Sequence, residues 1–148
     1  MKKIVLYSVV LIGAFFSCNK DNFYEKSDAK LKFSSSMVTF DTIFTTVSSI
    51  TKRLIVKNPY SADLLTDIYL VGDNNSYFSI NINGVSAKSL TDVKVPAKDS
   101  IFIFVKVILN PNQVNTPMLV TDTIRFITNG NKQNVELLAC GQDAHFII

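Results

Sequence analysis

Cysteine and histidine, the residue types most often used as nucleophiles, general bases and zinc ligands, are few in this sequence and lie far apart. The chain has two cysteines, Cys18 and Cys140, and a single histidine, His145. A histidine serves as a general base only where another group fixes its ring, and tetrahedral zinc requires clustered cysteines and histidines. The sequence offers neither arrangement. We therefore expect a protein that is not an enzyme and that carries no metal ion or other cofactor.

Other features that resemble ligand sites have simpler interpretations. The stretch Asp73-Asn74-Asn75-Ser76 carries oxygen ligands of the kind that calcium prefers, but it lacks the spacing of an EF-hand and is typical of a turn. The five glycines do not form a phosphate-binding loop. Cys140 has no basic residue beside it in the sequence, which indicates a small strand residue and not a reactive thiol.

The N-terminus has the pattern of a secretory signal peptide. Two lysines follow Met1, an apolar run covers residues 4–16, and the small residue Ser17 precedes Cys18. A membrane-spanning helix needs about 20 apolar residues, so this run is too short to be one. We predict a signal peptide over residues 1–17. Its removal takes away two lysines and lowers the formal net charge from +3 to +1, which gives no electrostatic reason to expect a nucleic-acid partner.

The segment Phe15-Phe16-Ser17-Cys18 resembles a bacterial lipobox, in which the chain is cut before a cysteine whose thiol is lipidated. Leucine is the usual residue where Phe15 stands, although lipoproteins of Bacteroidota tolerate such variation. The resemblance implies acyl chains such as palmitate on Cys18, and an outer-membrane lipoprotein that faces the periplasm or the cell surface. The alternative left open is that Cys18 is an ordinary residue of a discarded signal peptide.

One domain is expected after this anchor, because 148 residues provide one hydrophobic core and no second one. Residues 18–36 are mostly polar, which predicts a lipidated cysteine followed by a tether. Residues 37–142 are expected to form the domain, and residues 143–148 a C-terminal tail.

The pattern of residues 37–142 predicts an all-β domain, because short apolar stretches alternate with turn residues and no stretch keeps a helical period. An antiparallel, immunoglobulin-like β-sandwich of about seven strands fits this spacing. Asn83-Gly84 and Asn129-Gly130 are strong signals for hairpin turns. The expected strands cover residues 37–40, 49–57, 66–71, 77–83, 100–109, 121–128 and 134–140.

The order of these segments resembles the ASPM-SPD-2-Hydin and major-sperm-protein group of immunoglobulin-like domains. The matching parts are residues 38–40, 54–58, 95–100, 105–111 and 135–141. The chain is also similar to the N-terminal domain of longer lipoproteins of Bacteroidota. The resemblance leaves open whether this chain is a short or truncated relative of them.

One expected strand, residues 100–109, is apolar on both of its faces. Its alternation predicts an inward set, Ile101, Ile103, Val105 and Val107, and an outward set, Phe102, Phe104 and Ile108, with Lys106 among the outward residues. An exposed apolar surface usually marks a partner site. We therefore expect this face to dock an envelope protein or a neighbouring domain. The alternative is that the tether or a loop covers it.

Three hydroxyl residues and one tyrosine are candidates for contact with sugars. Thr42, Ser100 and Thr123 each lie in an Asp-Ser/Thr-apolar tripeptide, similar to the O-glycosylation acceptor of Bacteroidota. An Asp before β-forming residues is equally typical of the start of a strand. Tyr77, beside an Asn-rich loop, is the candidate to stack on a sugar ring.

The function predicted from these features is that of a non-catalytic, membrane-anchored lipoprotein module for adhesion, envelope assembly or partner presentation. The alternative is an accessory glycan-binding lipoprotein, which the absence of tryptophan disfavours.

Overall fold

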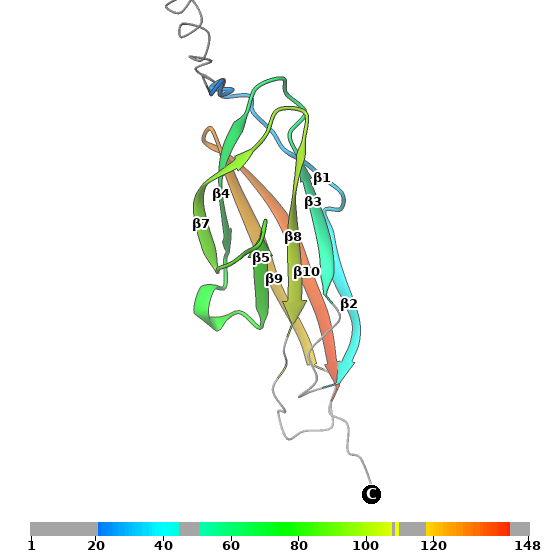
Figure 1. Cartoon of the computed structure of the whole chain (residues 1–148). Helices are drawn as coiled ribbons and strands as arrows, with labels where there is room; N and C mark the ends of the chain where they lie inside the picture. The colour runs from blue at the N-terminus through cyan, green and yellow to red at the C-terminus, as the bar shows by residue number, and fades with distance from the viewer. Residues whose placement is uncertain (1–20, 45–50, 108, 110–117, 143–148) are drawn as a thin grey trace, which may run out of the picture.

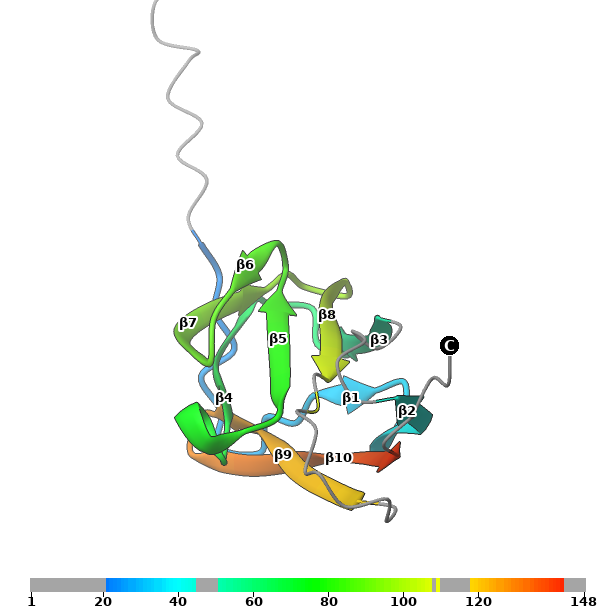
Figure 2. The same ribbon diagram turned by 90° about the horizontal axis from the view of Figure 1, so that it is seen from below.

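The computed structural model describes residues 21–44, 51–107, 109 and 118–142, which form ten strands in two facing five-stranded sheets (Figures 1 and 2). The first sheet has the order β1 (Lys32–Phe33), β3 (Lys52–Lys57), β8 (Ser100–Val107), β5 (Phe78–Ile82) and β6 (Val85–Ser86). The second sheet has the order β2 (Met37–Phe44), β10 (Asn131–Gln142), β9 (Met118–Thr128), β4 (Leu64–Leu70) and β7 (Ser89–Val95). The β2–β10 pair is parallel, and the other pairs of these strands are antiparallel.

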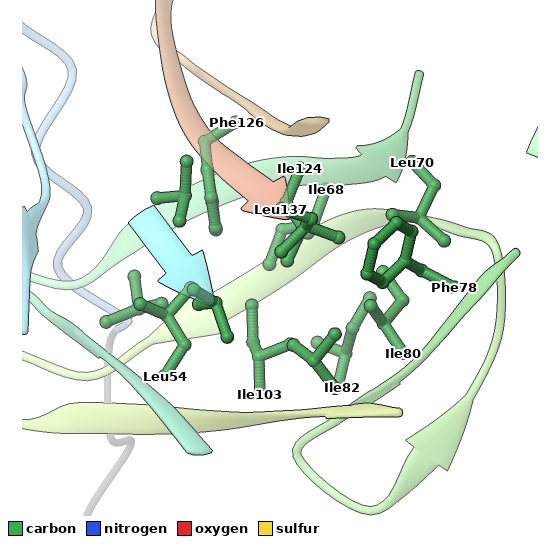
Figure 3. Close-up of a cluster of buried hydrophobic side chains, with 14 of the residues drawn as sticks. Leu54, Ile68, Leu70, Phe78, Ile80, Ile82, Ile103, Ile124, Phe126 and Leu137 are labelled. Atoms are coloured by element: carbon green, nitrogen blue, oxygen red, sulfur yellow. The ribbon is translucent and has the colours of Figure 1, made fainter. Parts of the chain in front are cut away.

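The core between the sheets follows from side chains that alternate along each strand. On β8 every second residue from Ile101 to Val107 is buried, as the sequence predicted. The same alternation on neighbouring strands directs the largest buried side chains, Phe78 and Phe126 among them, into the space between the sheets (Figure 3). The predicted β-sandwich is confirmed. Within the described part of the chain, no helix is long and apolar enough to cross a bilayer.

Both predicted hairpin turns are present. Asn83 and Gly84 connect β5 to β6 with φ angles of 48° and 95°, and Asn129 and Gly130 connect β9 to β10 with φ angles of 47° and 83°. Two successive positive φ angles define a type I′ turn, which matches the twist of the paired strands. Asn tolerates the first position and Gly the second, so these dipeptides set the register of both hairpins.

Three strands were absent from the sequence prediction. β1 and β6 contain two residues each, too few for an alternating pattern. β7 is an edge strand in which Asp92 has a φ of 53° and the register with β4 shifts between Thr66 and Ile68. This bulge interrupts the alternation by which a strand is identified, and it also makes the edge a poor template for pairing with another chain.

The segment expected to be a tether lies largely on the sandwich. Residues 21–33, called the N-terminal strap below, place Ala29 and Leu31 in the core with exposures of 0% and 3%. The ring of Tyr24 stacks on Tyr60 with a centroid distance of 4.0 Å, and the Phe33 ring lies 4.7 Å from that of Phe126. The strap is therefore part of the folded domain and not a free linker.

Amide side chains of the β9–β10 hairpin hold the strap. Asn129 Nδ2 donates to two strap carbonyls, those of residues 24 and 26, and Asn131 Nδ2 donates to those of residues 27 and 29. Gln133 accepts from Leu31 N at 2.8 Å and donates to Leu31 O at 3.0 Å. Because these side chains pair with backbone groups of the strap before β1, this part needs no strand pattern to satisfy them. Its polar composition is therefore similar to that of a tether.

Candidate binding face

The outward side of the first sheet carries two partly exposed phenylalanines. Phe102 is 39% exposed and Phe104 is 40% exposed, so both point outward from β8 as predicted. Ile108, the third residue predicted for this face, lies outside the described residues. The strap is held by amide side chains of β10, on the second sheet. In the part of the chain that the structure describes, both rings keep this partial exposure.

Neighbouring strands place polar groups beside the two rings. In the register of the sheet, Phe104 lies between Arg53 on β3 and Asn81 on β5. The Arg53 guanidinium carbon lies 5.4 Å from the centroid of the Phe102 ring, which is a cation–π distance. Below, the outer face means the outward residues Arg53, Ile55, Ser79, Asn81, Phe102, Phe104 and Lys106.

A shallow hollow of about 450 Å³ opens on the outer face. Its lining combines one aromatic ring with hydroxyl, amide and ammonium groups, from Thr51, Ser79, Ile80, Asn81, Ser86, Phe104 and Lys106. Asn81 donates to the Ser86 hydroxyl at 3.0 Å and accepts from Gly84 N at 2.9 Å, so the β5–β6 turn fixes the position of this amide. This hollow was not predicted from the sequence. The polar residues that alternate with apolar ones in residues 77–83 were the available signal for a polar surface at this place.

The other candidate residues lie apart from this hollow. Tyr77 is 45% exposed between η1 (Asp73–Asn75) and β5, and it does not line the hollow. Ser100 lies at the start of β8, partly exposed on the same side as the two rings. Thr123 lies on the second sheet, where its hydroxyl donates to Glu136 at 3.0 Å. The side chain of Thr42 is outside the described set.

Two of the aspartates that precede these hydroxyl residues have a structural role. Asp99 Oδ1 accepts from Ser100 N, and Asp122 Oδ1 accepts from Thr123 N, each at 2.7 Å. Asp122 Oδ1 also accepts from Gly72 N at 2.9 Å. These bonds fit the interpretation of Asp as a residue that starts or anchors a strand. O-glycosylation at the three positions stays a prediction.

No group of three or more His, Cys, Asp or Glu side chains that could hold a metal ion occurs in residues 21–44, 51–107, 109 and 118–142. The Asp73-Asn74-Asn75 stretch forms a short 3₁₀ turn. Cys140 is a free, partly buried residue of β10, and His145 lies outside the described residues.

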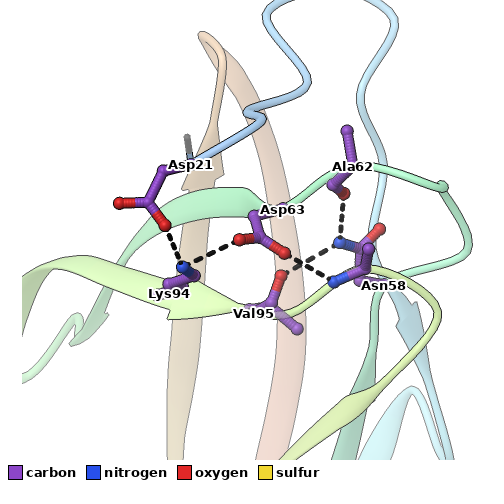
Figure 4. Close-up of polar contacts among 7 residues, drawn as sticks. Asp21, Asn58, Ala62, Asp63, Lys94 and Val95 are labelled. Atoms are coloured by element: carbon purple, nitrogen blue, oxygen red, sulfur yellow. Dashed lines mark hydrogen bonds and ion pairs between the residues drawn. The ribbon is translucent and has the colours of Figure 1, made fainter. Parts of the chain in front are cut away.

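A second hollow, of about 290 Å³, lies where the strap begins. Here Lys94 Nζ lies 2.8 Å from carboxylate oxygens of both Asp21 and Asp63 (Figure 4). The hydrogen bond from Lys94 and the one from Ala97 N hold the pKa of Asp63 below its ordinary value, and the bonds to Asp21 and Asp63 raise the pKa of Lys94 to about 12. These charges already pair with one another. The site therefore fastens the strap and is a weaker candidate for a ligand.

Asn58 organises the connection between β3 and β4, beside the ion pairs of Lys94 with Asp21 and Asp63. Its side chain is fully buried, and Nδ2 donates to Ala62 O at 2.8 Å and to Val95 O at 3.0 Å, while Oδ1 accepts from Tyr60 N at 2.9 Å (Figure 4). We expect Asn58→Ala to lower the free energy of unfolding by about 1–3 kcal/mol, because buried backbone groups lose their partners. Urea denaturation measures this, with the exposed Asn74→Ala as the control. Equal stability of the two variants would contradict the assigned role.

Comparison with known proteins places the chain by fold only. No family model and no curated protein matches the sequence. The CooA pilin subunit of enterotoxigenic Escherichia coli superposes with a TM-score of 0.52 and 9% identity, over 78% of this chain and 99% of the pilin. A protein of unknown function from Porphyromonas gingivalis gives a TM-score of 0.52 and 13% identity, over 76% of this chain and 48% of that protein. A family 123 glycoside hydrolase from Clostridium perfringens gives a TM-score of 0.52 and 5% identity, over 80% of this chain and 27% of the hydrolase.

These similarities define the domain as an immunoglobulin-like β-sandwich. The chain spans only 27% of the hydrolase and 48% of the Porphyromonas protein, and identities of 5–13% show the fold alone. One fold of this kind carries many unrelated functions, so the hydrolase supports no enzymatic activity for this chain.

Proposed function

We propose that this protein is a non-catalytic lipoprotein module of the bacterial cell envelope. Acyl chains on Cys18 hold it in the outer membrane after removal of residues 1–17, and the outer face docks a partner in adhesion, envelope assembly or presentation. The lipobox-like segment supports the anchor. We also propose that the domain is related to the ASPM-SPD-2-Hydin and major-sperm-protein group, which its sequence resembles. The domain itself contributes a rigid platform.

The observation that carries the docking role is the partial exposure of Phe102 and Phe104 in the middle of a regular sheet. Both rings flank the Arg53 side chain, and Phe104 also borders the hollow. Aromatic residues and arginine are the residue types enriched at the centres of protein interfaces.

The double variant Phe102→Ser/Phe104→Ser tests this role. We expect the variant to stay folded with a free energy of unfolding lowered by about 2–4 kcal/mol, because each ring is only about two-fifths exposed and packs its remaining surface against neighbours. In-cell cross-linking should give a defined adduct with the parent protein and lose it with the variant. Val71→Ser/Leu119→Ser, which alters exposed apolar residues elsewhere, serves as the matched control and should keep the adduct.

Two outcomes would contradict the docking role. If the double variant keeps the adduct, the partner binds another surface. If the double variant unfolds while the control does not, the two rings are covered from within the chain, which is the alternative considered from the sequence.

A second candidate function is glycan binding, and the lining of the hollow favours it. Hydroxyl and amide groups beside an aromatic ring are the contacts that a sugar requires, since its ring stacks on the aromatic face while its hydroxyls form hydrogen bonds. In this candidate function Phe104 offers the aromatic face, whereas Tyr77, the residue predicted from the sequence to stack on a sugar, does not line the hollow.

A further inference from the structure

We propose that the outer face binds an acidic polysaccharide, with a sugar ring stacked on Phe104 and its carboxylate beside Arg53 or Lys106. This inference rests on the proposed function, because it takes the same docking face and names the chemical class of its ligand. It follows from the distribution of charge, from the cross-strand register and from the shape of the face.

Charge is divided unequally between the two sheets. The strands of the first sheet carry five Lys or Arg residues and no Asp or Glu: Lys32, Lys52, Arg53, Lys57 and Lys106. The strands of the second sheet carry three basic residues and five acidic ones. The strands of the first sheet thus carry only positive formal charge, and four of the five cations are in register with the outward side, whereas Lys52 pairs with the inward residue Val105. Such a surface attracts an anionic partner and disfavours a basic one.

The register of the first sheet places complementary groups in one row. Arg53, Phe104 and Asn81 are direct cross-strand neighbours, and Lys106 pairs with Ser79 in the adjacent outward row. Directly opposite side chains have Cβ atoms about 4.5–5.5 Å apart. A ring stacked on Phe104 therefore has a cation on one side and an amide on the other. This arrangement matches a sugar that bears both a carboxylate and hydroxyl groups.

The shape of the face favours a polymer chain over a lipid surface. About three-fifths of each phenylalanine surface is covered by neighbours, so each ring offers an exposed face for stacking but little apolar area to insert into a bilayer. The hollow is lined by Ser79, Asn81 and Ser86, which a flat layer of headgroups would not fill. A flexible acidic chain can enter the hollow and still reach both cations.

Binding of polygalacturonate to the full chain, purified in detergent, tests the inference. We expect binding that weakens as salt is raised and that is lost with the fully methyl-esterified polymer, which keeps the sugar backbone but has no charge. Lys106→Gln should weaken binding about tenfold, the effect of losing one charge-assisted hydrogen bond. Lys132→Gln, which removes an exposed lysine from the second sheet, is the matched control and should bind like the parent.

A second pair of variants locates the stacked ring. Phe104→Ala should reduce binding by a similar factor of about ten, and Tyr77→Ala should leave it unchanged. Absence of binding, or equal binding of polygalacturonate and its methyl ester, would overturn the inference. Binding of the Cys18→Ser chain, which lacks the proposed anchor, to phosphatidylglycerol vesicles in place of the polymer would overturn it as well. In each of these cases the proposed docking role still stands if Phe102→Ser/Phe104→Ser loses its cross-linked adduct, so the two failures are distinguishable.

Discussion

Replacement of Leu31 by alanine is expected to lower the free energy of unfolding by about 2–4 kcal/mol. Leu31 belongs to the strap, yet its side chain is only 3% exposed and forms part of the core. Truncation removes buried methyl groups and leaves a cavity that the two sheets close only in part. A residue of a free tether would give no such effect, so the measurement decides whether the domain begins at the strap or after it.

Urea denaturation of the full chain measures the effect, and Leu119→Ala is the matched control. Leu119 is 67% exposed on β9, so the same truncation there should change the free energy of unfolding by no more than about 0.5 kcal/mol. If Leu31→Ala is as stable as Leu119→Ala, the strap does not contribute to the fold in solution, and the tether predicted from its composition is correct.

The sandwich could be predicted because its central strands are regular. Ile80 on β5 and Ile103 on β8 are buried between outward neighbours, and the alternation around each residue determines which face it occupies. The Asn-Gly dipeptides identified the two type I′ hairpins for a similarly local reason. The outward position of Phe102 and Phe104 followed from the same alternation, so this part of the candidate site was accessible from the sequence.

The remaining parts depend on contacts between segments far apart in the chain. The strap is held by Asn131 and Gln133, which lie about one hundred residues away, and no local pattern reveals such a pairing. The hollow requires β3, β8 and β5 to be neighbours in that order, which brings Thr51, Asn81 and Phe104 to one place. The unequal distribution of charged residues between the two sheets can likewise be recognised only when the strands are assigned to their sheets.

In a chain from which residues 1–17 have been removed, replacement of Cys18 by serine is expected to release the protein from the membrane completely. Binding through one acyl chain is marginal, with a constant of about 10⁴ M⁻¹, and a second chain makes attachment stable, so a protein without its acylated thiol loses the anchor as a whole. A fatty-acid probe should mark the parent protein and leave Cys18→Ser unlabelled. The parent should enter the detergent phase on phase separation, and the variant should stay in the aqueous phase.

Cys140→Ser is the matched control for Cys18→Ser, because it removes the only other thiol from a position within β10. It should keep both the label and the detergent partitioning of the parent.

The strap also limits the distance between the proposed anchor and the domain. Only residues 19–21 separate Cys18 from Asn22, whose carbonyl accepts from Asp63 N at 2.8 Å. Four residue steps span at most about 14 Å, so acylation at Cys18 confines the sandwich to the membrane surface. A parent protein that carries no lipid, or a Cys18→Ser variant that still enters detergent, would contradict the anchor and with it this confinement.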